Sequence, residues 1–267
     1  MLDAQMAALS SVRGAIPALA AAVAEAARRL GGGEGRLVYA GAGASARLAV
    51  QDGVELYPTF GWPHARLAYL IAGGEAALVR SVEGAEDDWA AGVEAVAGSR
   101  AGASDVFVCV AASGGTRFTR GVVAAARQAG AMTVGMANNR GAPLLEESEF
   151  PVLLESGAEF LAGSTRMGAG TAQKAALNLF STRVMTVLGR VYAGRMVCVV
   201  PSNAKLVKRA KRMVGVLSGA PAGAAAAAWE AMRDIRLAVL VLDGATEDEA
   251  RGRLAAAGGS LRRARGE

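Results

Sequence analysis

The sequence predicts an α/β fold: a three-layer α/β/α sandwich with a mainly parallel five-stranded sheet, plus a small C-terminal helical subdomain. Five apolar, strand-like runs alternate with helical patterns, as expected for a parallel sheet covered by helices on both faces. After Asn203 only helical patterns follow. The 267 residues are enough to bury a substantial core. We therefore predict a sheet domain over residues 1–205, beginning with an N-terminal helix, and a helical subdomain over residues 206–267.

Each element follows from its local pattern of apolar residues. Residues 1–30 have the apolar periodicity of an amphipathic helix. Strands are expected at Arg36–Ala40, Leu67–Ala72, Asp105–Ala111, Ala131–Met136 and Phe150–Leu154. Helices are expected after Ser45, around Glu86–Val96, from Thr116 to Gln128 and from about Gly170 to Val187. In the C-terminal part, the acidic residues of Thr246–Glu249 predict a helix N-terminus.

Composition and charge argue against two classes of binding partner, nucleic acids and membranes. The net charge of +5 comes largely from basic residues after residue 205, at the helical spacing that is typical of a solvated face. No nucleic-acid recognition motif accompanies them, so no nucleic-acid partner is predicted. No apolar run reads as long and uncharged enough to span a membrane. Asp3 near the start and Arg28-Arg29 at the end of the first helix are the reverse of a signal peptide. We expect a cytoplasmic protein with no membrane partner.

Cysteine and histidine usage argues against metal or nucleophilic chemistry. Cys109 and Cys198 each lie in an apolar, strand-like run, which predicts buried inert thiols. The single His64 sits in a Gly-Trp-Pro-His turn, a poor setting for a Ser-His-Asp mechanism. Without a Cys/His cluster, no metal site and no metal cofactor are predicted.

The run GSTRMGAGTAQKAALNL, residues 163–179, predicts a phosphate-binding loop. Ser164, Thr165 and Arg166 come just before an apolar-periodic helix. Backbone amides at a helix start, hydroxyl groups and an arginine together suit a phosphate monoester. Taken alone, the run is equally well explained as an ordinary capped helix, since Ser and Thr are common N-caps.

Two more loops of this kind follow predicted strands. The first, residues 41–45, ends at Ser45, and the second, residues 112–116, contains Ser113 and Thr116. Both turns fall at the carboxyl edge of the predicted parallel sheet, where ligands of open α/β sheets bind. Ala46 replaces the third glycine of a dinucleotide fingerprint, and no P-loop lysine is present. The three loops therefore favour a small sugar phosphate over a nucleotide.

Two glutamates are placed to act as acid and base on such a sugar. Glu55 ends the helix that begins near Ser45, and Glu86 lies among other acids in RSVEGAEDD. The alternative for that acidic cluster is a helix N-terminus that carries acids for its dipole. Ten residues of continuous helix between Ser45 and Glu55 span about 15 Å, longer than a hexose phosphate. Either the helix bends near Gly53, or Glu55 of one subunit serves the loops of another, which predicts a homodimer with sites shared between subunits.

Several segments together resemble the sugar isomerase (SIS) domain family, and within it the N-acetylmuramic acid 6-phosphate etherases. These are GAGASARL, VELYPTFG, IAGGEAALVRSVEGAEDD, AASGGT, GSTRMGAGTAQKAALNL and VVPSNAKL, in the order and spacing of the family. The C-terminal helices are similar to the family's small ubiquitin-associated-like domain. Three positions depart from the family: Ala44 and Ala46 stand where Thr and Gly are usual, and Gly168 where Lys is common. The family's polar N-terminal segment has no counterpart in this sequence.

The resemblance implies cleavage of the D-lactyl ether of N-acetylmuramic acid 6-phosphate by elimination and hydration, in cell-wall amino sugar recycling. The products would be N-acetylglucosamine 6-phosphate and D-lactate, with no metal or organic cofactor. By motif position, Glu55 matches the family's acid and Glu86 its base. The implied substrate-binding residues are Ser45, Ser113, Thr116, Ser164 and Thr165. Two alternatives stay open: a non-catalytic sugar-phosphate-sensing regulator, and a sugar-phosphate isomerase without a lactyl leaving group.

Overall fold

The computed structural model describes residues 1–267, and its internal contacts divide the chain into two compact units. The first unit contains Met1–Val54 and His64–Val184, and the second contains Glu55–Pro63 and Met185–Glu267. The second unit thus takes in a short segment from the early part of the chain, which sequence periodicity does not reveal. The domain boundary at residue 205 stays a prediction.

The first unit is built on one five-stranded sheet. Its strands are β1 (Leu37–Gly41), β2 (Leu67–Ile71), β3 (Val106–Val110), β4 (Met132–Ala137) and β5 (Phe150–Leu153). They pair in the order β2-β1-β3-β4-β5, and every pair is parallel. β1 and β3 are buried along their whole length, as strands covered on both faces must be. The predicted fold class and all five predicted strands are confirmed.

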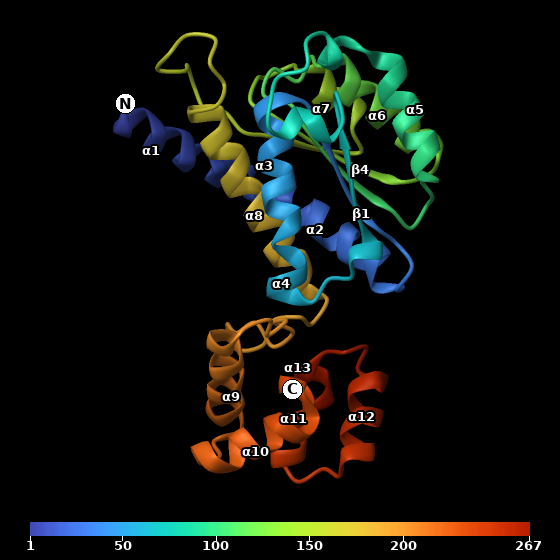
Figure 1. The fold of residues 1–267 in the computed structure, drawn as a ribbon. Coiled ribbons are helices and arrows are strands. Elements are labelled where there is room, and N and C mark those ends of the chain that lie inside the picture. Colours follow the sequence, from blue (N-terminus) through green and yellow to red (C-terminus); the bar gives the residue numbers. More distant parts are fainter. The chain divides into compact units, whose positions relative to one another are not determined.

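Helices cover both faces of the sheet (Figure 1). One face carries α5 (Trp89–Ser99), α6 (Arg117–Gln128) and α7 (Pro143–Glu147), and the other carries α2 (Ile16–Gly31), α3 (Gly43–Val54) and α8 (Gly168–Val187). The α5–α6–α7 side buries one contiguous apolar cluster that includes Val38, Phe107 and Val122. Short 3-10 turns connect the elements at Val12–Ala15, His64–Arg66, Glu75–Leu78 and Ala85–Asp87. The three-layer architecture follows from these two helical layers.

The strand order fixes where the sheet can bind a ligand. From β1 the chain first moves to β2 at one edge, and then crosses back to β3 on the other side of β1. This reversal is a topological switch point, where the loops after neighbouring strands diverge and leave a crevice at the carboxyl edge. The loops after β1 and β3, which carry Ser45 and Ser113, flank that point.

The N-terminal helices correct one expectation. α1 (Leu2–Ser11), a 3-10 turn and α2 form a helical stretch, Leu2–Gly31, that by length and composition alone is apolar enough to cross a membrane. The sequence prediction that no such stretch exists was wrong. A core helix passes the same test, and α2 buries a full stripe of side chains, including Leu19, Val23 and Leu30, at the sheet. The apolar character of this stretch is therefore only weak evidence for a membrane-spanning helix.

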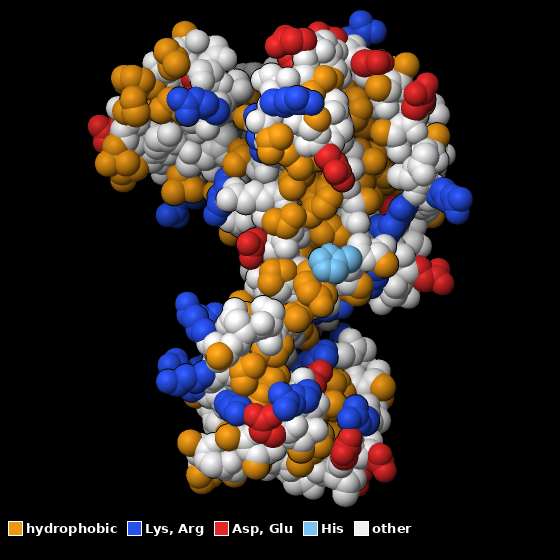
Figure 2. Space-filling model, in the orientation of Figure 1, with side chains coloured by type: hydrophobic (Ala, Val, Ile, Leu, Met, Phe, Trp, Pro, Cys, Tyr) orange, Lys and Arg blue, Asp and Glu red, His pale blue; other side chains and the backbone are white.

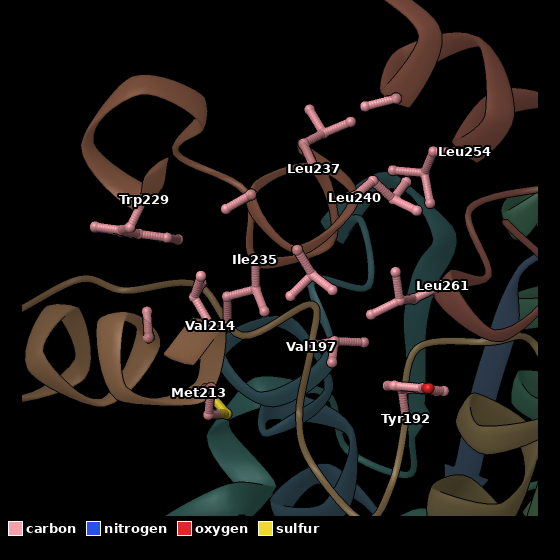
Figure 3. Packing of buried hydrophobic residues seen from close by; sticks show 14 of the residues in the cluster. Tyr192, Val197, Met213, Val214, Trp229, Ile235, Leu237, Leu240, Leu254 and Leu261 are labelled. Atoms are coloured by element: carbon pink, nitrogen blue, oxygen red, sulfur yellow. The ribbon is translucent and has the colours of Figure 1, made fainter. Parts of the chain in front are cut away.

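The second unit is helical. Its elements are α4 (Leu56–Phe60), α9 (Ala204–Ser218), α10 (Ala222–Met232), α11 (Ile235–Leu242), α12 (Glu247–Ala256) and α13 (Leu261–Ala264). They enclose an apolar cluster around Val214, Trp229, Ile235 and Leu240 (Figure 3). α12 begins as predicted: the Thr246 hydroxyl and the Glu249 carboxylate form a reciprocal capping box.

Cys198 does not lie in a strand, contrary to the sequence expectation. The run MVCVVP belongs to an irregular segment between α8 and α9, whose only β pairing is an isolated bridge between Tyr192 and Arg195. Val197 and Val199 face the helical cluster, which explains the strand-like alternation without a neighbouring strand. Cys109 is fully buried in β3 as predicted, while Cys198 is only partly buried.

One group of the basic residues in this C-terminal part lies on the exposed side of α9. Lys205, Lys208, Arg209 and Arg212 are solvent-exposed, whereas Ala210, Met213 and Val214 of the same helix are buried. Figure 2 shows Lys and Arg side chains at the surface of this helical unit. The arrangement is that of an amphipathic helix with a solvated basic face.

Candidate functional site

The loop after β1 places Ser45 in the first turn of α3. Gly41 is required there, because a Cβ atom would come within 2.8 Å of the Val110 carbonyl oxygen on β3. Ser45 is 7% exposed, and its hydroxyl group has no hydrogen-bond partner within the protein. The Ala46 amide bonds to the Ala42 carbonyl, while the amides just before it are left without protein acceptors. The hydroxyl group of Ser45 and free amides thus lie together at the helix start.

The loop after β3 presents Ser113 and Thr116 at the start of α6. Ser113 is exposed, and its Oγ accepts a hydrogen bond from the Gly115 amide at 3.1 Å. Gly114 has φ of +68°, and a Cβ atom there would lie 2.4 Å from the Ala142 Cβ, so only glycine fits. Thr116 is the N-cap of α6, yet its hydroxyl does not cap the helix. That hydroxyl is therefore available to a ligand.

The loop before α8 differs from the other two because an internal carboxylate occupies its helix start. Glu159 accepts hydrogen bonds from the amides of Gly168 at 2.9 Å and of Ala169 at 2.8 Å. Ser164 is half-buried and Thr165 is exposed, in the turn just before these amides. Sequence reasoning missed Glu159, because N-capping side chains normally stand next to the helix start and Glu159 precedes it by nine residues.

The structure brings the three hydroxyl loops to the same edge of the first unit. β1 and β3 are hydrogen-bonded neighbours, with Gly41 opposite Val110 at their carboxyl ends. At Gly170 in the first turn of α8, a Cβ atom would lie 3.4 Å from the Leu48 Cδ1 of α3. Ser45 lies in the first turn of α3, so the start of α8 lies against the helix that carries the first loop.

Glu86 lies on a pocket of about 230 Å³ beside the start of α3. The pocket is lined by Ala42, Gly43, Arg47, Ala72, Ala77, Arg80 and residues 81–86. The Glu86 carboxylate is exposed and makes no hydrogen bond or ion pair within the protein. Asp88, by contrast, caps α5 by accepting from the Ala91 amide at 2.9 Å. The acids of this cluster therefore differ in role: Asp88 caps α5, and Glu86 lines an open pocket.

The positive side chains of this pocket were not singled out from the sequence. Arg47 is held in place by its Nε, which donates to the Ala77 and Leu78 carbonyl oxygens at 3.2 and 3.1 Å. Arg80 is exposed and has no ion-pair partner. Arg80 begins the segment RSVEGAEDD that carries Glu86, which is the one sequence signal that could have indicated it.

Glu55 directly follows the last residue of α3 and is the N-cap of α4. It is exposed and makes no side-chain capping bond, and its contacts assign it to the second unit. α3 stays helical through Gly53 and ends at Val54. Gly53 is needed there for packing, because a Cβ atom would lie 2.6 Å from the Tyr69 hydroxyl oxygen and 3.0 Å from a Tyr39 ring carbon.

A buried carboxylate anchors the other end of α3. Asp52 is 6% exposed and accepts hydrogen bonds from the Tyr39 hydroxyl at 2.6 Å, the Asn178 amide at 2.6 Å and the Ser181 hydroxyl at 3.1 Å. Burial raises the pKa of Tyr39 well above its usual range, and the charge of Asp52 raises it further, so the phenol stays a donor. These bonds tie α3 to β1 and α8, and nothing in the sequence pattern indicated them.

No group of three or more His, Cys, Asp or Glu side chains is arranged to hold a metal ion. The sheet edge presents carboxylates, hydroxyl groups, arginines and backbone amides.

Comparisons with known proteins agree with this fold. The model of the glucokinase regulatory protein N-terminal SIS domain matches residues 18–127. The solved structure of an E. coli CFT073 protein has a TM-score of 0.50 at 15% identity, covering 72% of this chain and 92% of that chain, which supports the fold alone.

The sequence relatives are closer. The N-acetylmuramic acid 6-phosphate etherase of Deinococcus radiodurans is 49% identical over 269 residues, covering 100% of this chain and 88% of that protein. The protein of the same name from Cutibacterium acnes is 45% identical over 249 residues, covering 92% of this chain and 82% of that protein. This chain belongs to the N-acetylmuramic acid 6-phosphate etherase family.

Proposed function

We propose that this protein is a carbon–oxygen lyase that cleaves the D-lactyl ether of N-acetylmuramic acid 6-phosphate. The products are N-acetylglucosamine 6-phosphate and D-lactate. The name and the 49% identity of the Deinococcus radiodurans relative support the activity. The observation that carries it in the structure is Glu86, an unpaired carboxylate on a pocket at the sheet edge. The sensor and isomerase alternatives are not favoured, since the relatives that match along most of the chain are etherases.

The reaction proceeds through the open-chain sugar. The aldehyde at carbon 1 acidifies the proton on carbon 2, and the Glu86 carboxylate takes that proton. The electron pair of the broken C–H bond forms the double bond between carbons 2 and 3, and the bond from carbon 3 to the lactyl oxygen breaks. Glu55 gives a proton to the departing oxygen, so this oxygen leaves as the neutral hydroxyl group of D-lactate. Water then adds its hydroxyl to carbon 3 and a proton to carbon 2.

The hydroxyl loops hold the phosphate and the sugar hydroxyl groups. Ser45, Ser113 and Thr116 contribute hydroxyls next to the amides at the starts of α3 and α6, which have no internal acceptor. Ser164 and Thr165 contribute from the third loop, while Glu159 keeps the first amides of α8 occupied. The phosphate therefore lies nearer α3 and α6 than α8, because two like charges at one helix start repel.

We further propose a homodimer in which Glu55 of one subunit acts on substrate held by the other. α3 is uninterrupted from Gly43 to Val54, so Ser45 and Glu55 of one chain are separated by about 15 Å of helix. One hexose phosphate is shorter than this span, so both residues of a single chain would reach it only if the chain bent near Gly53. We place the enzyme in the cytoplasm, and its two domains at residues 1–205 and 206–267.

The direct test is release of D-lactate from N-acetylmuramic acid 6-phosphate by the purified protein. N-acetylglucosamine 6-phosphate should appear in equal amount. An isomerase would instead give an aldose–ketose product without lactate, and a sensor would bind the sugar phosphate unchanged. Either result would overturn the proposal.

A further inference from the structure

The second unit contains an arginine-rich pocket that the proposed chemistry does not use. Its volume is about 120 Å³, and Arg190, Arg233 and Arg236 line it together with a single carboxylate, Asp234. Arg190 comes from the segment after α8, Arg233 from the turn between α10 and α11, and Arg236 from the first turn of α11. Three guanidinium groups against one carboxylate leave an excess of positive charge, which favours an anionic ligand.

Two of these arginines already have carboxylate partners. Arg236 pairs with Asp234 at 2.6 Å, and its Nη1 donates to the Gly259 carbonyl oxygen at 3.1 Å. Arg233 pairs with Glu230 at 2.6 Å, although its side chain remains 66% exposed. As the N-cap of α11, the Asp234 carboxylate accepts hydrogen bonds from the Arg236 guanidinium and from the backbone amides of Arg236 and Leu237. It therefore does not neutralise a third arginine.

Arg190 has no carboxylate partner at all. Its Nη1 donates only to the carbonyl oxygens of Phe60 at 2.8 Å and Gly61 at 3.0 Å, and its guanidinium lies 5.1 Å from the centre of the Trp62 ring. Burial lowers the pKa of Arg190, and the charge of Arg236 lowers it further. A partly buried guanidinium without a counter-ion is costly, and a bound anion would relieve that cost.

Trp229 adds an independent sign of a missing acceptor. The side chain is 2% exposed, lines the same pocket, and its indole Nε1 is buried without a hydrogen-bond partner. Figure 3 shows its ring projecting from α10 at the margin of the apolar cluster. Buried donors of this kind are rarely left unpaired, and an indole N–H can only donate. The missing partner is therefore an acceptor such as an anion oxygen.

We propose that this pocket binds a small tetrahedral oxyanion, of the size of one phosphate group. Its volume is well below the roughly 300–1,000 Å³ of sites for drug-sized ligands, so a whole nucleotide does not fit. Guanidinium groups suit phosphate because their N–H groups match its oxygens in pairs. The pocket lies wholly in the second unit, so it is separate from the hydroxyl loops of the first.

The test is titration of the full-length protein with inorganic phosphate, followed through the indole N–H signals in a nitrogen–proton NMR spectrum. The chain has three tryptophans, so three such signals are expected, and Trp229→Phe assigns the relevant one. Phosphate should shift the Trp229 signal saturably, and sodium chloride at equal ionic strength should not. No saturable shift, or the same shift with chloride, would overturn the proposal.

Charge-matched variants localise the binding. Arg190→Gln should weaken phosphate binding at the Trp229 signal by about ten-fold or more, as for other hydrogen bonds to charged groups. Arg253→Gln removes the same charge from an exposed position on α12 and should bind as the wild type does. Arg190 also donates hydrogen bonds to the Phe60 and Gly61 carbonyl oxygens, so its loss could disturb the fold. Arg233→Gln is therefore a second test of the pocket, because the Arg233 side chain is exposed and its replacement should leave folding intact. Wild-type affinity in both pocket variants would refute the site.

Discussion

The carboxylate of Glu159 accepts a hydrogen bond from the backbone amide of Gly168 at 2.9 Å, at the first residue of α8. Its second oxygen takes the Ala169 amide at 2.8 Å. The helix start that the sequence marks most strongly as a phosphate cradle is therefore already satisfied by an internal anion. A Cβ atom at Gly168 would lie 3.4 Å from the same carboxylate.

Glu159→Ala should destabilise the start of α8. The change removes a charged cap at a helix N-terminus, which is worth on the order of 1 kcal/mol. Hydrogen exchange of the Gly168 and Ala169 amides should quicken, and the melting temperature should fall. Glu155→Ala is the control, since its exposed ion pair with Arg140 contributes little. Unchanged exchange at Gly168 and Ala169 would show that the Glu159 contacts do not hold the helix start in solution.

Ser113→Ala and Ser164→Ala should each raise the Michaelis constant more than they lower kcat. Each change deletes a hydroxyl group proposed to donate to the substrate, and a hydrogen bond to a charged group is worth about 1.5–3 kcal/mol, or roughly ten- to hundred-fold in affinity. Ser10→Ala on the exposed side of α1 is the matched control. Michaelis constants equal to that of the control in both variants would remove these loops from substrate binding.

Asp105 should make the sheet acid-sensitive. Burial alone would raise the pKa of Asp105, but hydrogen bonds from the Arg36 side chain and amide outweigh it and hold the pKa below its usual value of 3.8. A carboxylate with a depressed pKa stabilises the fold above its unfolded pKa, and this contribution is lost as the pH falls through the folded pKa. Asp105→Asn should therefore unfold more easily than the wild type at pH 7, with the difference shrinking below about pH 4. A difference in unfolding free energy that is constant from pH 7 to pH 3 would contradict this.

Subunit mixing should restore activity if the sites are shared. Glu55→Gln protein and Ser113→Ala/Ser164→Ala protein are each impaired, and heterodimers would contain one site with wild-type Glu55 and wild-type loops. Activity at low substrate concentration should recover after subunit exchange, and should not recover when Glu55→Gln is mixed with itself. No recovery in a verified heterodimer, or full activity in a strictly monomeric protein, would place Glu55 and the loops in one chain.

The sheet could be predicted because its strands are buried on both faces. Runs such as LVYA and VFVCVA are apolar throughout, which is the pattern of central parallel strands, and both form strands. The same logic failed at MVCVVP, because a run of apolar residues does not reveal whether a partner strand lies beside it. Val197 and Val199 are buried by helices instead.

The site was predictable only in part, for a similar reason. Hydroxyl loops after strands are local patterns, so Ser45, Ser113 and Thr116 could be assigned to helix starts at one sheet edge. Glu159, Asp52 and the pocket of Arg190 depend on contacts between residues far apart in the chain. Asp52 bonds to Asn178, 126 residues away, and no local pattern signals such a pair.

The central claim is that Glu86 removes the carbon 2 proton, and isotope exchange in deuterated water tests it most directly. The wild type and Glu83→Gln, a variant of the neighbouring acid on the same pocket, should release D-lactate and leave deuterium at carbon 2 of N-acetylglucosamine 6-phosphate. Glu86→Gln keeps the shape of the side chain but cannot accept a proton, so its rate should fall by about 10²–10⁴-fold while sugar-phosphate binding persists. Lactate release by Glu86→Gln at the wild-type rate, with deuterium at carbon 2, would contradict the account.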